Sequence, residues 1–260
     1  MSEALEEYRF NDAAGSCYQF VWHEFCDWYL EMAKLGIYSD DERLKANTKA
    51  VLADVLKTIL KLLHPFMPFI TEEVWQLLPG NDMSIMVADF PEVSTDEING
   101  KALADMHLLM GVITGIRNIR GEMRIPPSTL VHAVMDVPDK EKERVLAENL
   151  AHIHTLGKVE NFSVVSHAPK PEASATAVFE DMQIHVLLKG LLDFEEEKKR
   201  INKEIAKLEK ELGLSNRKLA NADFLEKAPP HIIEEVREKV ENLTGKLEKL
   251  HQNLDFFSGV

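Results

Sequence analysis

Residues 191–260 carry two heptad patterns of apolar residues separated by a break, and this feature restricts the fold more than any other. Apolar residues that recur at alternating steps of three and four form the seam of a coiled coil. The break, Ala220–His231, contains Pro229 and Pro230 and is long enough to reverse the chain. We therefore predict an antiparallel hairpin of two helices, because a parallel dimer would leave the break unexplained. The seam residues are Phe194, Ile201, Ile205, Leu208, Leu212 and Leu219 in the first helix, and Val236, Val240, Leu243, Leu247, Leu250 and Leu254 in the second.

The first helix of this hairpin is also the most basic stretch of the chain. The 260-residue sequence has a formal net charge of -14, yet eight bases and only three acids fall between residues 198 and 218. A basic flank on a coiled coil is usually a solvated face with Glu partners, but the second helix is too close to charge balance to neutralise the first. A solvated face and a polyanion-binding surface both stay open. The bases are Lys198, Lys199, Arg200, Lys203, Lys207, Lys210, Arg217 and Lys218.

Upstream, the sequence predicts amphipathic helices packed around residues 1–125. A continuous helix is predicted from Glu7 to Leu35, because apolar residues recur there at steps of three and four. A second helix should begin at Ser39–Glu42, which has the spacing of a capping box, and end near His64 because prolines follow. A short helix should then run to Leu78.

A third long helix is predicted after Ser94–Glu97, which repeats the capping-box spacing, and should run to about Met123 before Pro126 and Pro127. Short β-branched runs beyond it predict a small α/β connector over residues 126–190, with a helical segment near Lys140–Leu156. The predicted fold is mainly α, with a helical bundle at 1–125, this connector, and a coiled-coil hairpin at 191–260. The predicted strands are Leu130–Met135, Phe162–Val165, Ala177–Phe179 and Ile184–Leu188.

No pattern of catalytic or metal-binding residues stands out. The sequence has no glycine-rich phosphate loop, no paired His or Cys at ligand spacing, and no nucleophile elbow, so we expect no catalytic residue, cofactor or metal in this chain. Two cysteines, Cys17 and Cys26, exclude a disulfide framework. His152 and His154 are two residues apart, a weak metal signal. Without an apolar run of membrane length, we expect a cytoplasmic protein.

Two further groups of residues allow alternative interpretations. Arg117, Arg120 and Arg124 are spaced by three and four, so they should project along one helix face. They could contact successive phosphates or form ion pairs within the protein. The aromatic run Tyr18–Tyr29 could stack on bases, but its helical spacing favours packing in the core.

Three segments resemble the anticodon-binding region of the valyl, isoleucyl and leucyl tRNA synthetases. They read VWHEFCDWYLE (Val21–Glu31), LKLLHPFMPFITEEVW (Leu60–Trp75) and IRNIRGEMRIPPS (Ile116–Ser128). The C-terminal sequence GLLDFEEEKKRINKEIAKLEKEL, followed by RKLANADFLEKAPPHIIEEVREK (Arg217–Lys239), is similar to the coiled-coil arm that closes bacterial valyl enzymes. The resemblance covers essentially the whole chain and favours the valyl family over the isoleucyl and leucyl ones.

The resemblance implies a parent ligase of which this chain is the C-terminal part. Such a parent is a monomer that joins valine to its tRNA with ATP and Mg²⁺ and hydrolyses mischarged threonine. The HIGH and KMSKS motifs, the editing domain and the opening helices of the bundle are missing, so the resemblance implies a fragment that is inactive alone. Its expected partners are tRNA(Val) and the missing catalytic domain, with no DNA and no membrane. The expected tRNA-binding residues are Arg117, Arg120 and Arg124, the eight bases between 198 and 218, and Lys239, which matches a basic position of the family's arm.

A stand-alone interaction protein is the alternative, with a coiled coil that binds a partner helix or self-associates. Its seam residues would carry the function, and salt would have little effect on binding because apolar burial is not screened. Binding to tRNA should instead weaken steeply as salt rises. The equivalent region of an isoleucyl or leucyl enzyme is a further alternative.

Overall fold

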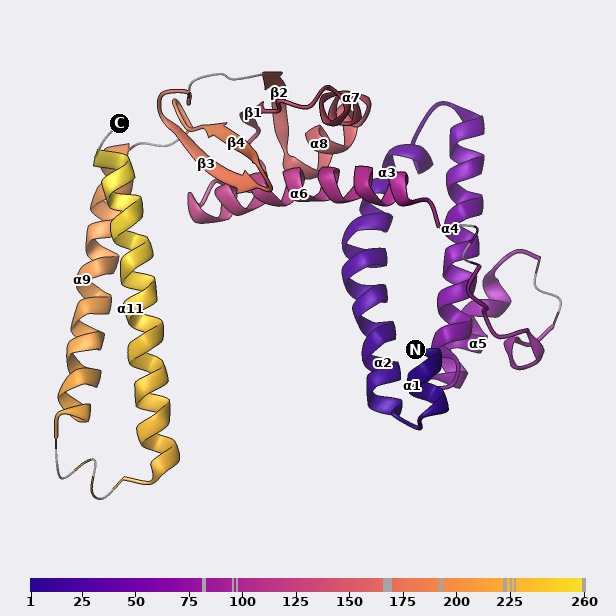
Figure 1. Cartoon of the computed structure of the whole chain (residues 1–260), viewed down its shortest axis with the longest axis horizontal. Coiled ribbons are helices and arrows are strands. Elements are labelled where there is room, and N and C mark those ends of the chain that lie inside the picture. Colours follow the sequence, from indigo (N-terminus) through magenta and orange to yellow (C-terminus); the bar gives the residue numbers. More distant parts are fainter. Residues whose placement is uncertain are drawn as a thin grey trace.

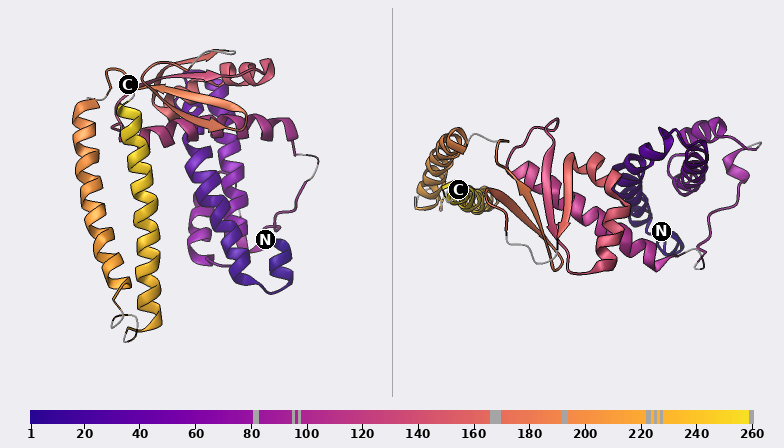
Figure 2. Two further views of the ribbon diagram at one scale, coloured as in Figure 1. Left: turned by 60° about the vertical axis from the view of Figure 1, so that its left-hand side comes forward. Right: turned by 90° about the horizontal axis from the view of Figure 1, so that it is seen from above.

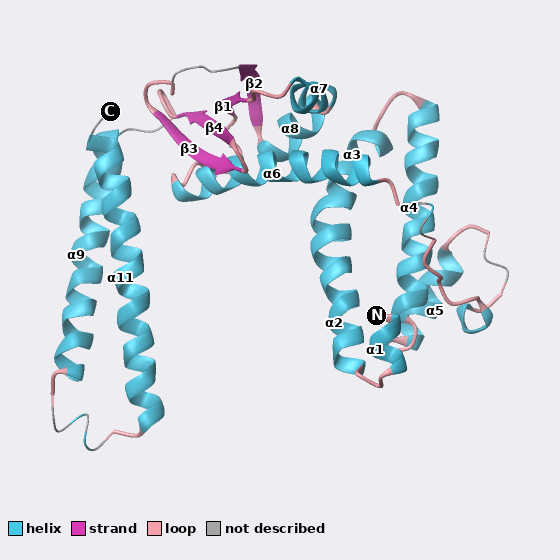
Figure 3. Cartoon of the chain, viewed as in Figure 1, coloured by secondary structure: helices cyan, strands magenta, loops and turns pink. Residues whose placement is uncertain are grey.

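The computed structural model shows a mainly helical chain with one small sheet (Figure 3). It describes residues 1–80, 83–94, 96, 98–165, 170–191, 194–221, 224, 226 and 228–258. The N-terminal helices lie at one end, the sheet and helix α6 lie in the middle, and a long helical hairpin lies at the other end (Figure 1). The predicted fold class is confirmed.

Helices precede the sheet, and among them α4 contacts α2, α3 and α5. The elements of this part are α1 (Ser2–Glu6), α2 (Phe10–Gln19), the π-helical stretch η1 (Phe20–Tyr29), α3 (Leu30–Ile37), α4 (Glu42–Leu63), α5 (Pro68–Leu77), the 3-10 turn η2 (Ile85–Val87) and α6 (Gly100–Glu122). The predicted end of α4 at His64 and the short helix after it are confirmed, because Pro65 stops α4 and Pro68 opens α5.

Two predicted helix starts differ in detail from the structure. The first helix does not run unbroken from Glu7, because Tyr8 has a left-handed φ of 57° and the helix restarts at Phe10. The cap of α4 is Asp41 instead of Ser39, since the Asp41 carboxylate accepts hydrogen bonds from the backbone of Arg43 at 2.9 Å and of Leu44 at 3.1 Å.

The start of α6 also differs from the prediction. Its cap is Asn99, whose side chain accepts a hydrogen bond from the Ala102 backbone at 3.0 Å. The predicted capping box at Ser94–Glu97 lies partly outside the described residues, since Thr95 and Glu97 are not among them. Asn99 is preferred because it lies directly before the first residue of the helix.

The four predicted strands are present and form one mixed sheet. They are β1 (Val131–Asp136), β2 (Val159–Val165), β3 (Ser174–Phe179) and β4 (Met182–Leu187), in the order β2-β1-β4-β3. β1 and β2 run parallel and are joined by α7 (Lys140–Glu148) and α8 (Leu150–Gly157), whereas the other pairs are antiparallel. The single predicted helix over Lys140–Leu156 is therefore broken at Asn149.

Helix α6 packs closely against the sheet because two glycines face the strands. A Cβ at Gly111 would lie 2.1 Å from Cζ of Phe179, and one at Gly115 would lie 2.6 Å from Cδ1 of Ile184. Both distances are shorter than side-chain contacts allow. The small residues therefore set the distance between α6 and strands β3 and β4.

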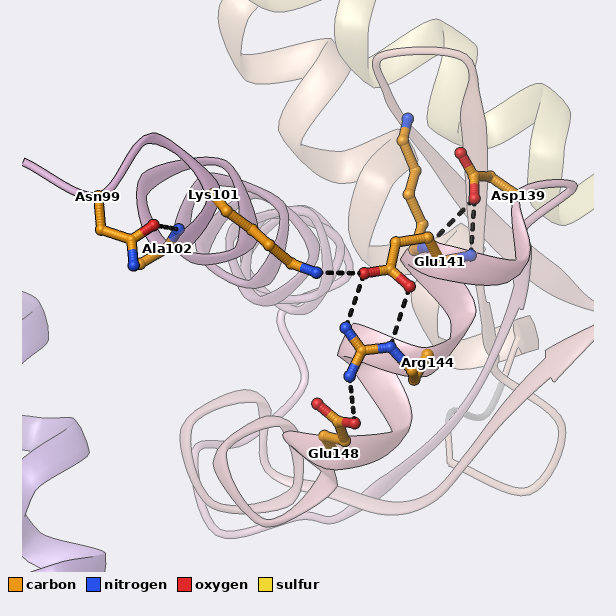
Figure 4. Close-up of polar contacts among 8 residues, drawn as sticks. Asn99, Lys101, Ala102, Asp139, Glu141, Arg144 and Glu148 are labelled. Carbon is orange, nitrogen blue, oxygen red and sulfur yellow. Dashed lines mark hydrogen bonds and ion pairs between the residues drawn. The ribbon is translucent and has the colours of Figure 1, made fainter.

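The first turn of α6 is also linked to α7 by a polar cluster around Glu141 (Figure 4). The Glu141 carboxylate accepts a hydrogen bond from Lys101 of α6 at 2.6 Å and two from Arg144, at 2.7 and 3.0 Å. These donors hold the pKa of Glu141 at about 2, well below its ordinary value.

The predicted hairpin consists of α9 (Phe194–Leu219) and α11 (Pro230–Ser258), which lie side by side and run in opposite directions (Figures 1 and 2). The seam residues Ile201, Ile205, Leu243 and Leu247 are buried between them. Ile201, Ile205 and Leu247 also belong to the same apolar core as α6 and the sheet. The base of the hairpin is therefore continuous with the body of the molecule.

Candidate nucleic-acid interface

Six bases of α9 lie on the side of the helix that faces away from α11. In a helix with about 100° per residue, these bases fall within roughly a third of the circumference, opposite the buried seam. All six are exposed, and no ion pair to any of them occurs among the described residues. This surface, here called the basic stripe, consists of Lys199, Lys203, Lys207, Lys210, Arg217 and Lys218.

The other predicted bases of the hairpin have acidic neighbours. Lys198 pairs with Glu195 at 2.9 Å, and Arg200 pairs with Glu204 at 2.9 Å, both within α9. Lys239 of α11 lies 4.0 Å from Glu211 of α9. Part of the positive charge counted in the sequence is therefore neutralised locally.

The distal end of the basic stripe borders a shallow depression. It has a volume of about 430 Å³, and Arg217 and Lys218 of α9 line it together with Lys239 of α11. Leu214, which is 52% exposed, adds an apolar surface beside these cations. The structure thus brings Lys239 to the same end of the hairpin as Arg217.

The outer face of α11 has a different character. Its exposed residues include the acids Glu234, Glu238 and Glu241 beside the bases Lys246 and Lys249, and Arg237 pairs with Glu234 at 3.7 Å. The two outer faces of the hairpin therefore differ in charge, and the α9 side is the one that attracts a polyanion.

The three arginines at the end of α6 do not form a shared face. Arg117 donates to the backbone carbonyl of Leu156 at 3.0 Å, and its guanidinium lies 5.1 Å from the centre of the Trp28 ring. Arg117 is exposed, so part of its guanidinium is still open to solvent. It also bridges α8 and the π-helical stretch.

Arg120 is a structural residue and is only 7% exposed. Its guanidinium donates to the backbone carbonyls of Thr129 at 2.8 Å and Pro126 at 2.9 Å, with longer contacts to Pro127 and Lys158 at 3.4 Å. Burial lowers its pKa from the ordinary value. The prediction that Arg120 binds a phosphate is wrong, because its donors are directed into the protein.

Arg124 lies beyond the last residue of α6 and pairs with the hairpin. Its Nη2 is 3.0 Å from each carboxylate oxygen of Glu204 in α9. An ion pair within the protein is one of the two interpretations that the sequence allows for this arginine. No local pattern identifies Glu204 as the partner, because the two residues are 80 positions apart.

The aromatic run at Tyr18–Tyr29 is divided between core and surface. Phe25 is buried, as the helical spacing predicted, whereas Tyr18 and Trp22 are 56% and 53% exposed. Their rings stack with centroids 6.2 Å apart and an interplanar angle of 7°. Core packing therefore accounts for only part of the run.

The histidines singled out in the sequence have separate surroundings. His154 Nδ1 lies 2.8 Å from the Val159 carbonyl, whereas His152 is close to the backbone of Met32 and burial lowers its pKa. Within the described ranges, no three His, Cys, Asp or Glu side chains are grouped as metal ligands would be. Nor does any helix in the described parts combine the length and apolar character needed to cross a membrane.

Comparison with known proteins places this geometry in context. Residues 1–135 match the family model of the anticodon-binding domain of tRNA ligases, and residues 193–257 match that of the valyl-tRNA synthetase tRNA-binding arm. Both matched families are therefore named for binding tRNA or its anticodon.

Whole-chain relatives agree with these matches. A valine–tRNA ligase of Syntrophotalea carbinolica is 44% identical over 255 residues, which cover 97% of this chain and 28% of the relative. Those of Geobacter sulfurreducens and Thermotoga maritima are 44% and 39% identical, over 98% of this chain and 29% and 28% of their own lengths. The chain therefore spans less than a third of the length of the curated relatives that it matches.

Proposed function

The chain belongs to the anticodon-binding family of tRNA ligases and carries the tRNA-binding arm of valyl-tRNA synthetases, and on this premise we propose that it positions tRNA(Val) for aminoacylation. The hairpin holds the tRNA through phosphate contacts along α9, while the helical bundle lies nearer the anticodon stem. Phosphate contacts fix orientation without reading sequence, so the identity of the tRNA is read elsewhere.

The observation that carries this proposal is the basic stripe. Its six cations extend from Lys199 to Lys218, which corresponds to about 28 Å of helix at the usual rise per residue. Charges that have no ion-pair partner among the described residues are available to replace the counterions of a nucleic-acid backbone. Their alignment on one exposed face lets a single polyanion contact several of them.

The chemistry of ligation is part of the same proposal. The relatives are named valine–tRNA ligases, and we propose that the chemistry with ATP and Mg²⁺ takes place in a catalytic domain outside this chain. Our proposal therefore assigns no catalytic or cofactor-binding residue to the chain. We also propose that the parent enzyme acts as a monomer in the cytoplasm. We propose that the chain consists of three units, residues 1–125, 126–190 and 191–260.

The alternative of a free coiled-coil interaction module is not favoured by the hairpin. Ile201 and Leu243 are only 1% and 5% exposed, because the two helices of one chain cover each other's seam. A partner helix would have to displace α9 or α11 to reach these residues.

The test is binding of the full chain to tRNA(Val) over a salt series, with two matched triple variants. The first variant, Lys199→Gln with Lys203→Gln and Lys210→Gln, removes three charges from the basic stripe. The control, Arg237→Gln with Lys246→Gln and Lys249→Gln, removes three charges from exposed positions of α11.

Only the first variant should lose affinity, and its dependence of log K on log salt should become shallower by about 0.7–0.9 for each phosphate contact removed. Equal losses in both variants would show that total charge, and not the basic stripe, governs binding. Failure of the unsubstituted chain to bind tRNA(Val) at any salt would contradict the proposed function.

A further inference from the structure

An ion-pair cluster at the base of the hairpin links α9 to the end of α6. Glu204 of α9 accepts two contacts from Arg124 Nη2, each of 3.0 Å, and a third of 2.9 Å from Arg200 Nη1. Both oxygens of the carboxylate are therefore engaged. One cation comes from the body of the molecule and the other from the hairpin itself.

The backbone at Arg124 is adapted to this contact. Arg124 has a φ of 51°, and the hydrogen bonds from Arg124 N to the Gly121 carbonyl and from Ile125 N to the Arg120 carbonyl close the end of α6. Helices that end in this way usually have glycine at the left-handed position. An arginine there is held in an uncommon conformation, and its side chain reaches the hairpin.

The apolar contacts at the same place do not set an angle by themselves. Ile201 and Ile205 of α9 join the central core, so the base of the hairpin is anchored. Apolar burial is non-directional, whereas ion pairs with two engaged oxygens restrict the relative orientation of the groups. Glu204 thus adds directional contacts to an anchor that apolar packing provides.

We propose that Glu204 is a positioning residue that sets the direction of the hairpin relative to the body, and so places the basic stripe where tRNA meets it. This inference rests on the proposed function. From Glu204 to Arg217 the helix extends about 20 Å, so a rotation of about 10° at the base moves the distal cations by roughly 3 to 4 Å. Such a displacement is as large as the length of a phosphate contact.

The decisive variant is Glu204→Gln, because a pure charge effect and a positioning effect predict opposite changes in its affinity for tRNA(Val). Removing an acid from a tRNA-binding helix, and with it the Glu204 contact of Arg124, should tighten binding if only charge matters. If Glu204 positions the hairpin, binding to tRNA(Val) should instead weaken, by about three- to tenfold at low salt. The matched control is Glu209→Gln on the same helix, since Glu209 is exposed and has no ion-pair partner among the described residues.

Support requires that Glu204→Gln weakens binding while Glu209→Gln leaves it equal or tighter. Arg124→Asn should share the defect of Glu204→Gln, because asparagine tolerates the left-handed backbone but cannot reach Glu204. Combining the two substitutions should cause little further loss, since both remove one contact. Binding by Glu204→Gln that is as tight as that of Glu209→Gln would overturn the inference and leave the proposed function intact.

A second measurement reports the orientation itself. Spin labels at Lys140→Cys in α7 and Asn221→Cys beyond α9, in a Cys17→Ala and Cys26→Ser background, give a distance distribution between body and hairpin. The distribution should broaden with Glu204→Gln and not with Glu209→Gln. An unchanged distribution would overturn the inference even if tRNA binding had weakened.

Discussion

The end of α6 and the outer face of α9 both carry bases at steps of three and four, but they lie in different surroundings. At the end of α6, Arg120 is buried among backbone carbonyls and Arg124 pairs with Glu204. Along α9, the six cations of the basic stripe face solvent. Basic residues at the same spacing can therefore stabilise the fold in one place and be available for binding in another. The partners of each side chain determine which of the two roles it has.

The largest expected effect tests the structural side of this comparison. Arg120→Gln should lower the free energy of unfolding by about 2–4 kcal/mol, because several buried carbonyls lose charged donors. Urea denaturation measures the change, with Arg117→Gln as a control of smaller effect. A loss below about 0.5 kcal/mol would mean that Arg120 is dispensable for the fold.

The contact of α6 with the sheet provides the next test. Gly111→Ala should lower the free energy of unfolding by about 1–3 kcal/mol, since the added methyl group meets the ring of Phe179. Gly121→Ala is the matched control in the same helix, because nothing lies within 4 Å of a Cβ there. If the two variants unfold at the same urea concentration, the close approach of α6 to β3 is not a constraint.

A third test compares single charges from the two regions. Lys207→Gln should weaken tRNA(Val) binding about threefold at low salt, with a free energy of unfolding within about 0.5 kcal/mol of the original. Arg117→Gln should change tRNA binding less, because its guanidinium is already engaged by Leu156 and Trp28. The reverse order of the two effects would assign the tRNA contact to α6.

The smallest expected effect is a change in stability at acidic pH that arises from the ion pairs of Glu141. The folded pKa of Glu141 is about 2, below its ordinary value of 4.5, so its ion pairs add stability above pH 4.5 and lose it as the pH falls towards 2. The stability difference between the unsubstituted chain and Glu141→Gln should therefore disappear over that range. A difference that persists at pH 2 would contradict the assigned ion pairs.

The sequence predicted most of the helices and all four strands, because heptad spacing, prolines and β-branched runs are local signals. It assigned the cap of α4 to Ser39 instead of Asp41, since several polar residues there can cap a helix and only the folded geometry selects one. The break at Tyr8 was missed because an unfavourable φ at a non-glycine residue has no sequence signature.

The candidate site was predictable only in part. The bases of α9 were found by composition. Their separation into the paired Lys198 and Arg200 and a stripe without ion pairs among the described residues depends on neighbours in the fold. Burial of Arg120 and its bonds to carbonyls of a proline turn follow from how α6 meets the sheet. The pair of Arg124 with Glu204 joins residues too distant in sequence for any local pattern to indicate.

The most direct test of the central claim is lysine acetylation of the full chain with and without tRNA(Val), followed by mass spectrometry. The account predicts that tRNA protects Lys199, Lys203, Lys207, Lys210 and Lys218 of α9, while Lys246 and Lys249 of α11 react at unchanged rates. Equal protection of both helices, or protection confined to α11, would contradict the assignment of the basic stripe as the tRNA-binding face.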